Sequence, residues 1–459
     1  MAGWRGWLKK KRADFQNDQF QETQAFLKLA RQQLKDTSGA NLAWLDAGLR
    51  AALLADGRTL LEQFLNQEQL HLAGAATRAG ERCYAERPRT CQTVFGAVTL
   101  QRDYYRHAAS GQTRWPLDEA LGLVQNCTPA LARMMCRAGS LEPFEAASQS
   151  LACYAGVAVV GRRIQRLLQV VGPAIEKWTG QLAPPQPLPV VPVFYVEADG
   201  TGVPMRKGQL KGCRGRQPDG TAKGREVKLG CVFTQHGVDG EGYPLRDPDS
   251  TSYLASFAGA KAFGAALRVE AQHRGIAGAL KTVFLGDGAA WLWNLARINF
   301  PGAICILDLY HATEHLTVLT DALYGPGTSR AKTQFTEWLR RFKDEPDGVA
   351  TVLGAAEADL PKPRARRKLA RQQIQYFRKN QKRMAYACFR QQGLFLGSGV
   401  IEAGCKTTVG QRVKQSGMFW NVAGSQNVLS TRCAIFSHRY EQYWQPPSPA
   451  PSPAISLAA

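Results

Sequence analysis

Hydrophobic and polar residues near the start of the chain recur mainly at helical intervals. Residues 14–75 follow this pattern, most clearly in LDAGLRAALLADGRTLLEQFLNQE. Residues 88–107 instead alternate apolar and polar positions around Gly96, which predicts an antiparallel hairpin. We therefore expect a mainly helical region over 1–80 and a small β-hairpin element over 81–125.

A pair of helices joined by a short turn is predicted within 126–181. Residues 143–154 and 160–172 have helical patterns, and a short Gly-containing segment separates them. This arrangement is typical of a helix-turn-helix that binds DNA, but an ordinary packed helical hairpin with a basic outer face fits equally well. Three cations lie on the second helix, where a recognition helix carries its contacts: Arg162, Arg163 and Arg166.

Strands and helices alternate after a proline-rich segment, 182–192, which predicts a stiff linker and a domain boundary. The order of three strands, a helix and then β-α-β-α predicts a ribonuclease-H-like fold over 193–316, a mixed five-stranded sheet with helices on both faces. The predicted strands are 193–198, 226–235, 251–257, 281–287 and 302–310, and the predicted helices between them are 259–273 and 289–300.

A strongly basic helical segment, 317–395, interrupts this alternation before apolar helices return over 396–444. Between 360 and 401 there are eleven Lys and Arg residues and no Asp or Glu, and the whole chain has a net charge of +21. A solvated helix face is one explanation, but so many like charges favour a phosphate-bearing partner such as DNA. The central cations of this segment are Arg366, Arg367, Lys368 and Arg371.

Acidic residues lie at the ends of three of the predicted strands. Asp199, Asp287 and Asp308 each come at such a strand end, where α/β folds place their sites, and Glu402 follows a Gly-Ser-Gly turn. A few carboxylates suffice to hold paired Mg²⁺ ions for phosphoryl transfer. The alternative is that Asp199 and Asp287 are turn residues, because Asp-Gly is also a common turn dipeptide.

Long segments of the chain closely resemble the ISKra-type insertion-sequence transposases, relatives of the Mutator-like DDE group. The resemblance implies a ribonuclease-H-like catalytic domain with Asp199, Asp287 and Glu402 as its triad, Asp308 being the alternative second acid. It also implies a basic helical insertion before the Glu. The segments that carry it are WPLDEALGL (115–123), YVEADGTGVPM (195–205), GREVKLGCVF (224–233), RDPDSTSY (246–253), FLGDGAAWLWNLA (284–296), FPGAICILDLYHATEHL (300–316) and GLFLGSGVIEAGCKTTVGQRVKQSGMFW (393–420).

The cofactor expected from this resemblance is a pair of Mg²⁺ or Mn²⁺ ions held by the triad. Zinc is not expected, although many relatives carry a cysteine-paired zinc element before the PLDE segment. Cys83 and Cys91 are the nearest cysteines before that segment, and their spacing does not suit a four-ligand zinc site.

Other candidates surround the triad in the sequence. His311 and His315 share one helix face and are expected to support the carboxylates, with metal binding beside Cys305 as the alternative. Trp420 can stack on an exposed base or, more commonly for a tryptophan, be buried. Three cations follow Glu402 and are expected to contact DNA or to lie on a solvated helix: Lys406, Arg412 and Lys414.

The sequence thus predicts a transposase that cuts transposon ends and joins them to target DNA, acting as a homo-oligomer on terminal inverted repeats. The rival hypotheses are a catalytically inactive, transposase-derived DNA-binding protein and a ribonuclease-H-like nuclease without strand transfer. No secretory signal or membrane-spanning run is recognisable, which predicts a bacterial cytoplasmic, nucleoid-associated protein. The tail, 445–459, is rich in Pro, Ser and Ala and is expected to be disordered.

Overall fold

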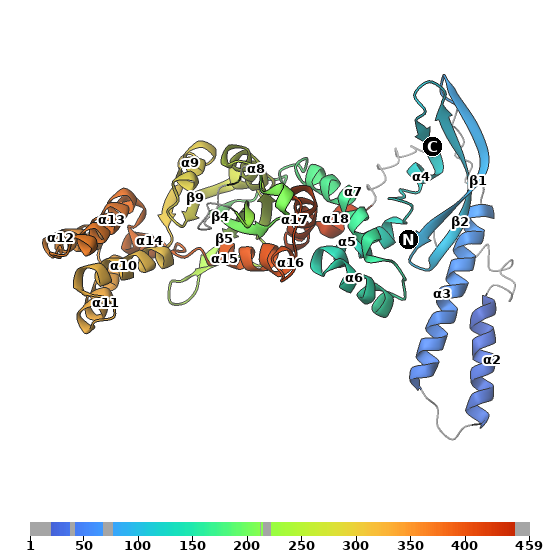
Figure 1. Ribbon diagram of the computed structural model, residues 1–459, viewed down its shortest axis with the longest axis horizontal. Helices are drawn as coiled ribbons and strands as arrows, with labels where there is room; N and C mark the ends of the chain where they lie inside the picture. Colours follow the sequence, from blue (N-terminus) through green and yellow to red (C-terminus); the bar gives the residue numbers. More distant parts are fainter. Residues whose placement is uncertain (1–19, 37–41, 68–76, 212, 214–221, 446–459) are drawn as a thin grey trace, which may run out of the picture. The chain divides into compact units, whose positions relative to one another are not determined.

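The computed structural model describes residues 20–36, 42–67, 77–211, 213 and 222–445 (Figure 1). It divides into two compact units, 1–168 and 169–459, which are described separately. The division falls inside helix α7 (Gly161–Thr179), ahead of the predicted linker at 182–192. The proline-rich segment is not a free linker, because Pro185 and Pro189 pack closely against Gly275 of unit 2.

Unit 1 begins with two helices, α2 (Gln21–Asp36) and α3 (Leu42–Gln67), which contact each other through Phe26 and Trp44. A long antiparallel hairpin follows, formed by β1 (Glu81–Thr93) and β2 (Gly96–His107). Gly96 has a φ of +117°, which an L-residue rarely adopts, and it begins the second strand. The predicted hairpin is therefore confirmed, with strands longer than the sequence pattern indicated.

Short helices complete unit 1 and lead into unit 2. Helix α6 ends in a π-helical turn, η2, and five residues later α7 begins, close to the helices predicted from the sequence. Gly161, the first residue of α7, lies so close to the backbone of Phe144 that a side chain would clash there. The remaining elements of unit 1 are β3 (Thr113–Arg114), α4 (Pro116–Ala120), α5 (Pro129–Leu141), α6 (Phe144–Ser150) and η2 (Leu151–Ala155).

Unit 2 is built on a five-stranded mixed sheet with the strand order β10-β9-β4-β5-β8. The β4–β5 and β5–β8 pairs are antiparallel, whereas β4–β9 and β9–β10 are parallel. This confirms the predicted sheet and is consistent with a ribonuclease-H-like fold. The strands are β4 (Val191–Pro204), β5 (Gly224–Gln235), β8 (Ser252–Ser256), β9 (Ala279–Gly286) and β10 (Ile304–Leu307). A short hairpin, β6 (Gly237–Val238) with β7 (Pro244–Leu245), was not predicted.

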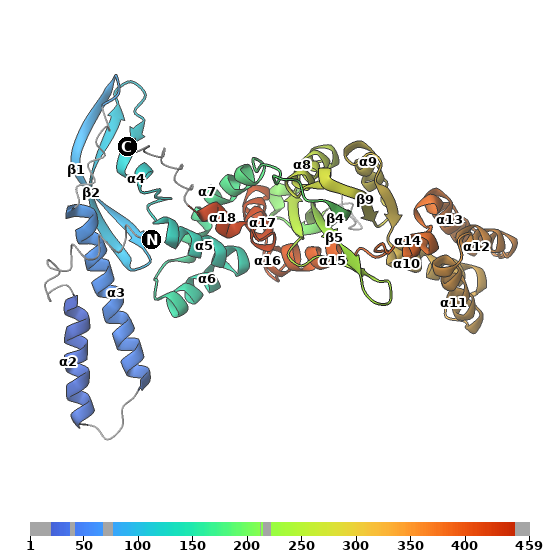
Figure 2. The same ribbon diagram turned by 180° about the vertical axis from the view of Figure 1, so that it is seen from behind.

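Helices cover both faces of this sheet (Figures 1 and 2). On one face, α8 (Ala260–His273) and α9 (Ala290–Asn299) bury apolar side chains against Phe194 and Val196 of β4. On the other face lies α15 (Gly399–Gly404), since successive strand residues point to opposite sides and Glu197 contacts that helix. Each fully buried apolar side chain of the core contributes roughly 1.5–3 kcal/mol to folding.

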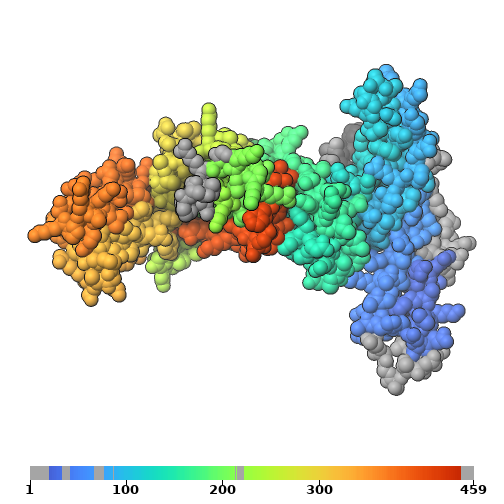
Figure 3. Space-filling model, in the orientation of Figure 1, coloured from blue at the N-terminus to red at the C-terminus, as the bar shows by residue number. Residues whose placement is uncertain are grey.

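A helical insertion follows β10 and appears in gold and orange beside the sheet in Figure 3. Trp338, Phe342 and Phe377 form part of its buried interior. Its elements are α10 (Leu309–Tyr324), α11 (Ser329–Asp344), α12 (Gly348–Ala358), α13 (Arg364–Asn380), η5 (Gln381–Arg383) and α14 (Tyr386–Gln391).

The chain then returns to the sheet through α15 and a final group of helices. Among the described residues, no helix is both long and apolar enough to cross a membrane. Residues 446–459, nearly all of the predicted tail, lie outside the described part of the chain. The last elements are η6 (Cys405–Gly410), α16 (Gln411–Val413), α17 (Val422–Phe436) and α18 (Tyr440–Trp444).

Candidate functional site

The predicted acids of unit 2 lie where the parallel strands of the sheet end, and this end of the strands is called the acidic edge below. Asp287 directly follows β9 and Asp308 directly follows β10, and these strands are parallel neighbours. Asp199 lies inside β4, paired with Leu229 of β5, so the prediction that it ends its strand is wrong. Pairing of β4 with β9 nevertheless stops at Glu197, two residues before Asp199, so Asp199 extends past the end of β9 on that side.

Glu402 reaches this edge from α15, and backbone and side-chain hydrogen bonds hold it there. The Ser398 hydroxyl donates to Glu402 Oε1 (3.3 Å), and the Ser398 N–H donates to Asp308 Oδ1 (3.0 Å). The N–H of Ile401, the residue before Glu402, donates to Glu197 Oε2 on β4 (2.8 Å). The turn that carries Glu402 is therefore tied to β4 and to the end of β10.

Asp199 is close enough to its neighbours for their charges to affect it. Burial raises the pKa of the Asp199 carboxyl, and the negative charge of Asp287 raises it further, while His311 acts in the opposite direction. The Cys405 thiol, from the helix after Glu402, donates to Asp199 Oδ2 (3.5 Å). Asp199 thus lies near Asp287 and beside Cys405, three residues after Glu402, so segments that are far apart in the sequence meet here.

His311 lies among these carboxylates. Its Nδ1 is 2.5 Å from Asp308 Oδ2, and this hydrogen bond raises the pKa of His311 to about 9. Ligand atoms of Asp308, His311 and Glu402 all lie within 4.8 Å of one another. Because its pKa lies above neutrality, the imidazole is positively charged at pH 7 and partly offsets the clustered negative charge.

His315 lies one turn further along α10 but has different contacts. Its Nδ1 is 2.6 Å from Gln373 Oε1, and its ring stacks on Tyr376 with the ring centroids 3.7 Å apart. Both partners belong to α13 of the insertion. His315 therefore supports the packing of α10 on α13. Its effect on the acidic edge is indirect, through its contact with Tyr376.

Asp308 and Asp287 differ in how their oxygens are used. Asp308 is fully buried and accepts from the backbone N–H groups of Tyr310, His311 and Ser398 and from the His311 ring. It caps the N-terminus of α10. Burial is the largest single effect and raises the pKa of Asp308, but the hydrogen bonds from His311 and Ser398 and the charge of His311 together outweigh it and hold this pKa below its usual range.

The Asp287 carboxylate is half-buried and, among the described residues, accepts from the Ala289 N–H alone (2.8 Å). Its second oxygen is available to a ligand. Asp287 therefore has more unused ligand capacity than Asp308, whereas Asp308 is the acid whose ligand atom lies within 4.8 Å of Glu402 and His311. The choice of Asp287 as the second acid stays a prediction.

Sequence reasoning missed Glu197, which lies below the other acids. It is fully buried, burial raises its pKa to about 8, and its Oε1 has no hydrogen-bond partner among the described residues. An acid inside the apolar strand VFYVEA, two positions before Asp199 and hence on the same strand face, was the signal that could have revealed it.

Two tyrosines of the insertion were also missed. The Tyr376 hydroxyl donates to the backbone carbonyl of Asp287 (3.2 Å), and the buried Tyr386 hydroxyl donates to the carbonyl of Leu307 (3.0 Å). Each bond holds the backbone at an acid-bearing strand end. No sequence pattern links residues so far apart, so neither contact was predictable.

The cations that follow Glu402 divide into two groups. Lys406 and Lys414 are exposed, and Lys414 Nζ hydrogen-bonds to Thr201, two residues after Asp199. Arg412, in contrast, is fully buried and lies over the ring of Trp420, 5.1 Å from its centroid. The surface role predicted for Arg412 is therefore wrong, whereas Trp420 is buried, the commoner of its two predicted outcomes.

The predicted cations of the insertion are also not equivalent. Lys368 and Arg371 are exposed on α13. The Arg366 guanidinium donates to the carbonyls of Ala322 and Leu323 at the end of α10, and Arg367 donates to the Pro361 carbonyl. Arg366 therefore has a structural role in addition to its charge.

In unit 1, the cations of α7 show a similar division. Arg162 and Arg166 are exposed. Arg163 is half-buried and its guanidinium lies within hydrogen-bond range of the Gln125 and Asn126 carbonyls. The first two are available to a partner, whereas Arg163 fastens α7 to the loop between α4 and α5.

The first part of the chain is similar to a known protein family. Residues 35–215 match the model of the uncharacterised protein family UPF0236. This match covers less than half of the chain and extends from the N-terminal helices through β4, which includes Asp199. No curated protein matches the chain. The comparison therefore relates the first part of the chain to a family without adding an activity.

Proposed function

We propose that this protein is a DNA transposase that cleaves transposon ends and joins them to target DNA. The observation that supports this most strongly is a group of acids at one edge of a mixed sheet consistent with a ribonuclease-H-like fold: Asp199 lies near Asp287, and Glu402 lies close to Asp308 and His311. The resemblance of the surrounding sequence to ISKra-type transposases names Asp199, Asp287 and Glu402 as the triad. The exposed cations of α13 supply the charge that a DNA substrate needs.

The donor set fits divalent metal ions with a preference for oxygen, such as Mg²⁺ or Mn²⁺. Asp199 has a raised pKa partly because Asp287 is close, and an added cation relieves that repulsion. Asp287 and Glu402 each have one hydrogen-bond donor among the described residues, so their remaining oxygens are available. Two ions held by these residues would stabilise charge on the phosphoryl oxygens and lower the pKa of the attacking water.

The protein's own residues orient the site and balance its charge. Asp308 orients the His311 ring beside Glu402, where it can balance the charge of the carboxylates. Lys406 and Lys414, exposed on the segment after Glu402, are placed to contact the backbone of the DNA strand. No covalent enzyme–DNA intermediate is needed, because water and then the freed 3′-OH act as the nucleophiles.

The test uses the full chain, DNA that carries the sequences flanking the gene, and a separate target plasmid. We expect Mg²⁺- or Mn²⁺-dependent cleavage at the element's ends, followed by joining of those ends to the plasmid. Asp199→Asn should abolish both steps while DNA binding in a gel-shift assay persists. Glu241→Gln, which alters an exposed acid outside the site, is the matched control and should be fully active.

The outcomes separate the hypotheses. Cleavage without joining would identify a nuclease, and DNA binding without cleavage would identify a DNA-binding protein; either result contradicts the proposal. Since two ends must be cut together, we also expect the protein–DNA complex to contain at least two protomers. Its mass in solution, measured by light scattering, tests this part of the proposal.

A further inference from the structure

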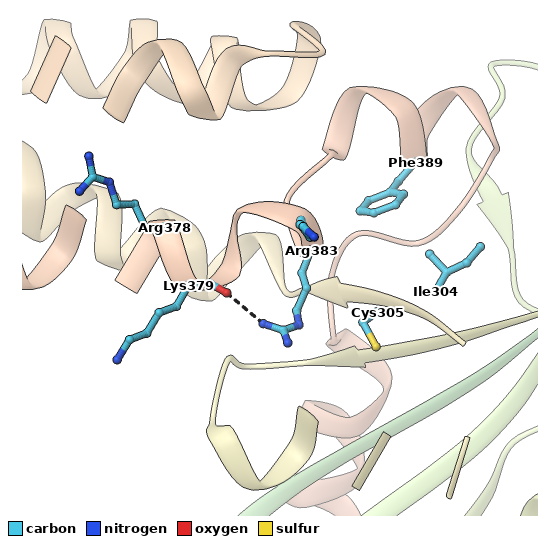
Figure 4. Close-up of a pocket in the computed structure, with 7 residues that line it drawn as sticks. Ile304, Cys305, Arg378, Lys379, Arg383 and Phe389 are labelled. Carbon is cyan, nitrogen blue, oxygen red and sulfur yellow. Dashed lines mark hydrogen bonds between the residues drawn. The ribbon is translucent and has the colours of Figure 1, made fainter. Parts of the chain in front are cut away.

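A hollow lies beside β10, the edge strand of the sheet, where the insertion meets it (Figure 4). Its volume is about 510 Å³, which lies within the size range of small-ligand sites. Ile304 and Cys305 of β10 line one side, with Phe389 nearby, and the end of α13 and the turn η5 line the other. A second hollow of about 470 Å³ adjoins it, and Cys305 and Arg383 line both.

The lining is cationic. Arg378, Lys379, Lys382 and Arg383 contribute four positive charges, and none of the lining residues is acidic. Arg378 is partly neutralised by an ion pair with Glu357 outside the hollow. The ammonium groups of Lys379 and Lys382 have no ion-pair or hydrogen-bond partner among the described residues. The charge of the hollow is therefore available to an anion.

Arg383 is fixed in place before any ligand binds. Its NH1 donates to Asn380 Oδ1 (3.0 Å) and to the Lys379 carbonyl (3.2 Å), the latter drawn in Figure 4. Its guanidinium also lies over the ring of Trp293, 4.4 Å from the centroid. A cation that is already ordered loses little side-chain entropy on binding a phosphate.

The hollow lies a short way along the sheet from the acidic edge. Cys305 precedes Asp308 by three residues, and at about 3.3 Å per strand residue this corresponds to roughly 10 Å. One strand of duplex DNA carries a phosphate about every 3.4 Å along the helix axis. Because the strand also winds around that axis, neighbouring phosphates are further apart in space than this rise, and a strand that passes the acids can present a phosphate about one or two nucleotides away to this hollow.

We propose that this hollow binds a backbone phosphate of the DNA strand that is cleaved at the Asp199–Asp287–Glu402 site. The proposal rests on the proposed function for the identity of the strand, but the hollow's affinity for DNA is measured separately. Phosphate is the ligand because the cations are clustered, partly ordered and, apart from Arg378, not paired with an acid among the described residues. The contact between the hollow and the phosphate fixes the position of the DNA strand relative to the acids. It therefore helps to determine which phosphodiester bond is cut.

The first experiment compares the DNA affinity of the full chain with that of the Lys379→Ala/Lys382→Ala double variant at several salt concentrations. Loss of one phosphate contact should reduce the slope of log K against log[salt] by about 0.9. The control is Lys261→Ala/Lys332→Ala, which removes the same charge from two exposed lysines outside the hollow. An unchanged slope in the Lys379/Lys382 variant, or an equal change in the control, would overturn the proposal.

The second experiment locates the contact with DNA in which single phosphates are replaced by uncharged methylphosphonates. In the wild-type chain, neutralising one phosphate about one or two nucleotides from the cleaved bond should weaken binding. The same replacement should have no effect in the double variant, which lacks the contact. If the wild-type chain cleaves DNA but no position behaves in this way, the hollow is not the phosphate site. If the position appears but cleavage does not, the proposed function fails while the phosphate site stands.

Discussion

The acidic edge of the sheet and the basic face of the insertion are built in different ways. At the acidic edge, the key bonds join residues distant in the sequence: Ser398 to Asp308 across 90 residues and Ile401 to Glu197 across 204. The exposed cations of α13, by contrast, follow from helical spacing within one element. The acids therefore depend on the whole fold of unit 2, whereas the cations depend mainly on the helix that carries them.

The largest effect is expected from changing an acid with an available oxygen. Asp287→Asn should reduce DNA cleavage below detection, because the amide carries no charge to hold a divalent cation. DNA affinity and the urea-unfolding midpoint should remain near wild-type values. Cleavage assays run beside Glu241→Gln check this, and an active Asp287→Asn enzyme would return the role of second acid to Asp308.

Replacing Asp308 should instead affect folding. Asp308→Ala removes the cap of α10 and the partner of protonated His311, so we expect a loss of about 1–3 kcal/mol in the free energy of unfolding. Urea denaturation gives this value. Asp287→Ala serves as the comparison and should lose much less, and equal losses in the two variants would remove the distinction drawn between these acids.

A smaller effect is expected from the contact that joins the two regions. Tyr376→Phe removes the hydroxyl bond to the Asp287 carbonyl but keeps the ring that stacks on His315, so stability should fall by about 0.5–1.5 kcal/mol. Cleavage should slow by about tenfold, the lower end of the roughly 10–100-fold effects of outer-shell partners of metal ligands, because Tyr376 holds the backbone of Asp287 and not its carboxylate. DNA affinity should not change.

The control for this variant is Tyr243→Phe, which alters an exposed ring outside the site. Stability and cleavage are measured in parallel for both proteins. A Tyr376→Phe enzyme as fast as the control would mean that the insertion does not help to hold Asp287.

The smallest effects should separate two arginines of α13. Arg366→Ala removes donors to the end of α10 and should cost about 1 kcal/mol of stability. Arg371→Ala should leave stability unchanged and, if Arg371 contacts one phosphate, reduce the salt slope of DNA binding by about 0.9. Thermal unfolding and salt titrations of both variants test this, and the reverse pattern would contradict the assignment.

The sequence was informative where one element decides the outcome. Alternating and helical patterns predicted the five strands and their order along the chain. This was possible because the apolar residues of each strand indicate by themselves that the strand is buried. The acids were recognisable because strand ends and long motifs mark them. The strand end at Asp199 was misplaced, because β5 continues to pair with β4 as far as Pro204.

What the sequence could not provide were contacts made across the fold. Arg412 is charged, so its sequence predicts an exposed position. Only the structure shows that it is buried against Trp420. The bonds from Tyr376 and Tyr386 likewise depend on where the insertion folds back. The same holds for the hollow beside β10, which exists only once η5 and the edge strand are adjacent.

The two tyrosine hydroxyls bear on how such a protein can be re-engineered. If the insertion only carried charge, it could be exchanged between related proteins. Its DNA-binding cations would be kept, and the sheet of the recipient protein would not be affected. Here, excision would leave the carbonyls of Asp287 and Leu307 without these donors and would loosen both ends that present acids. A functional chimera therefore has to transplant the tyrosines with the helices, in matching register with the recipient strands.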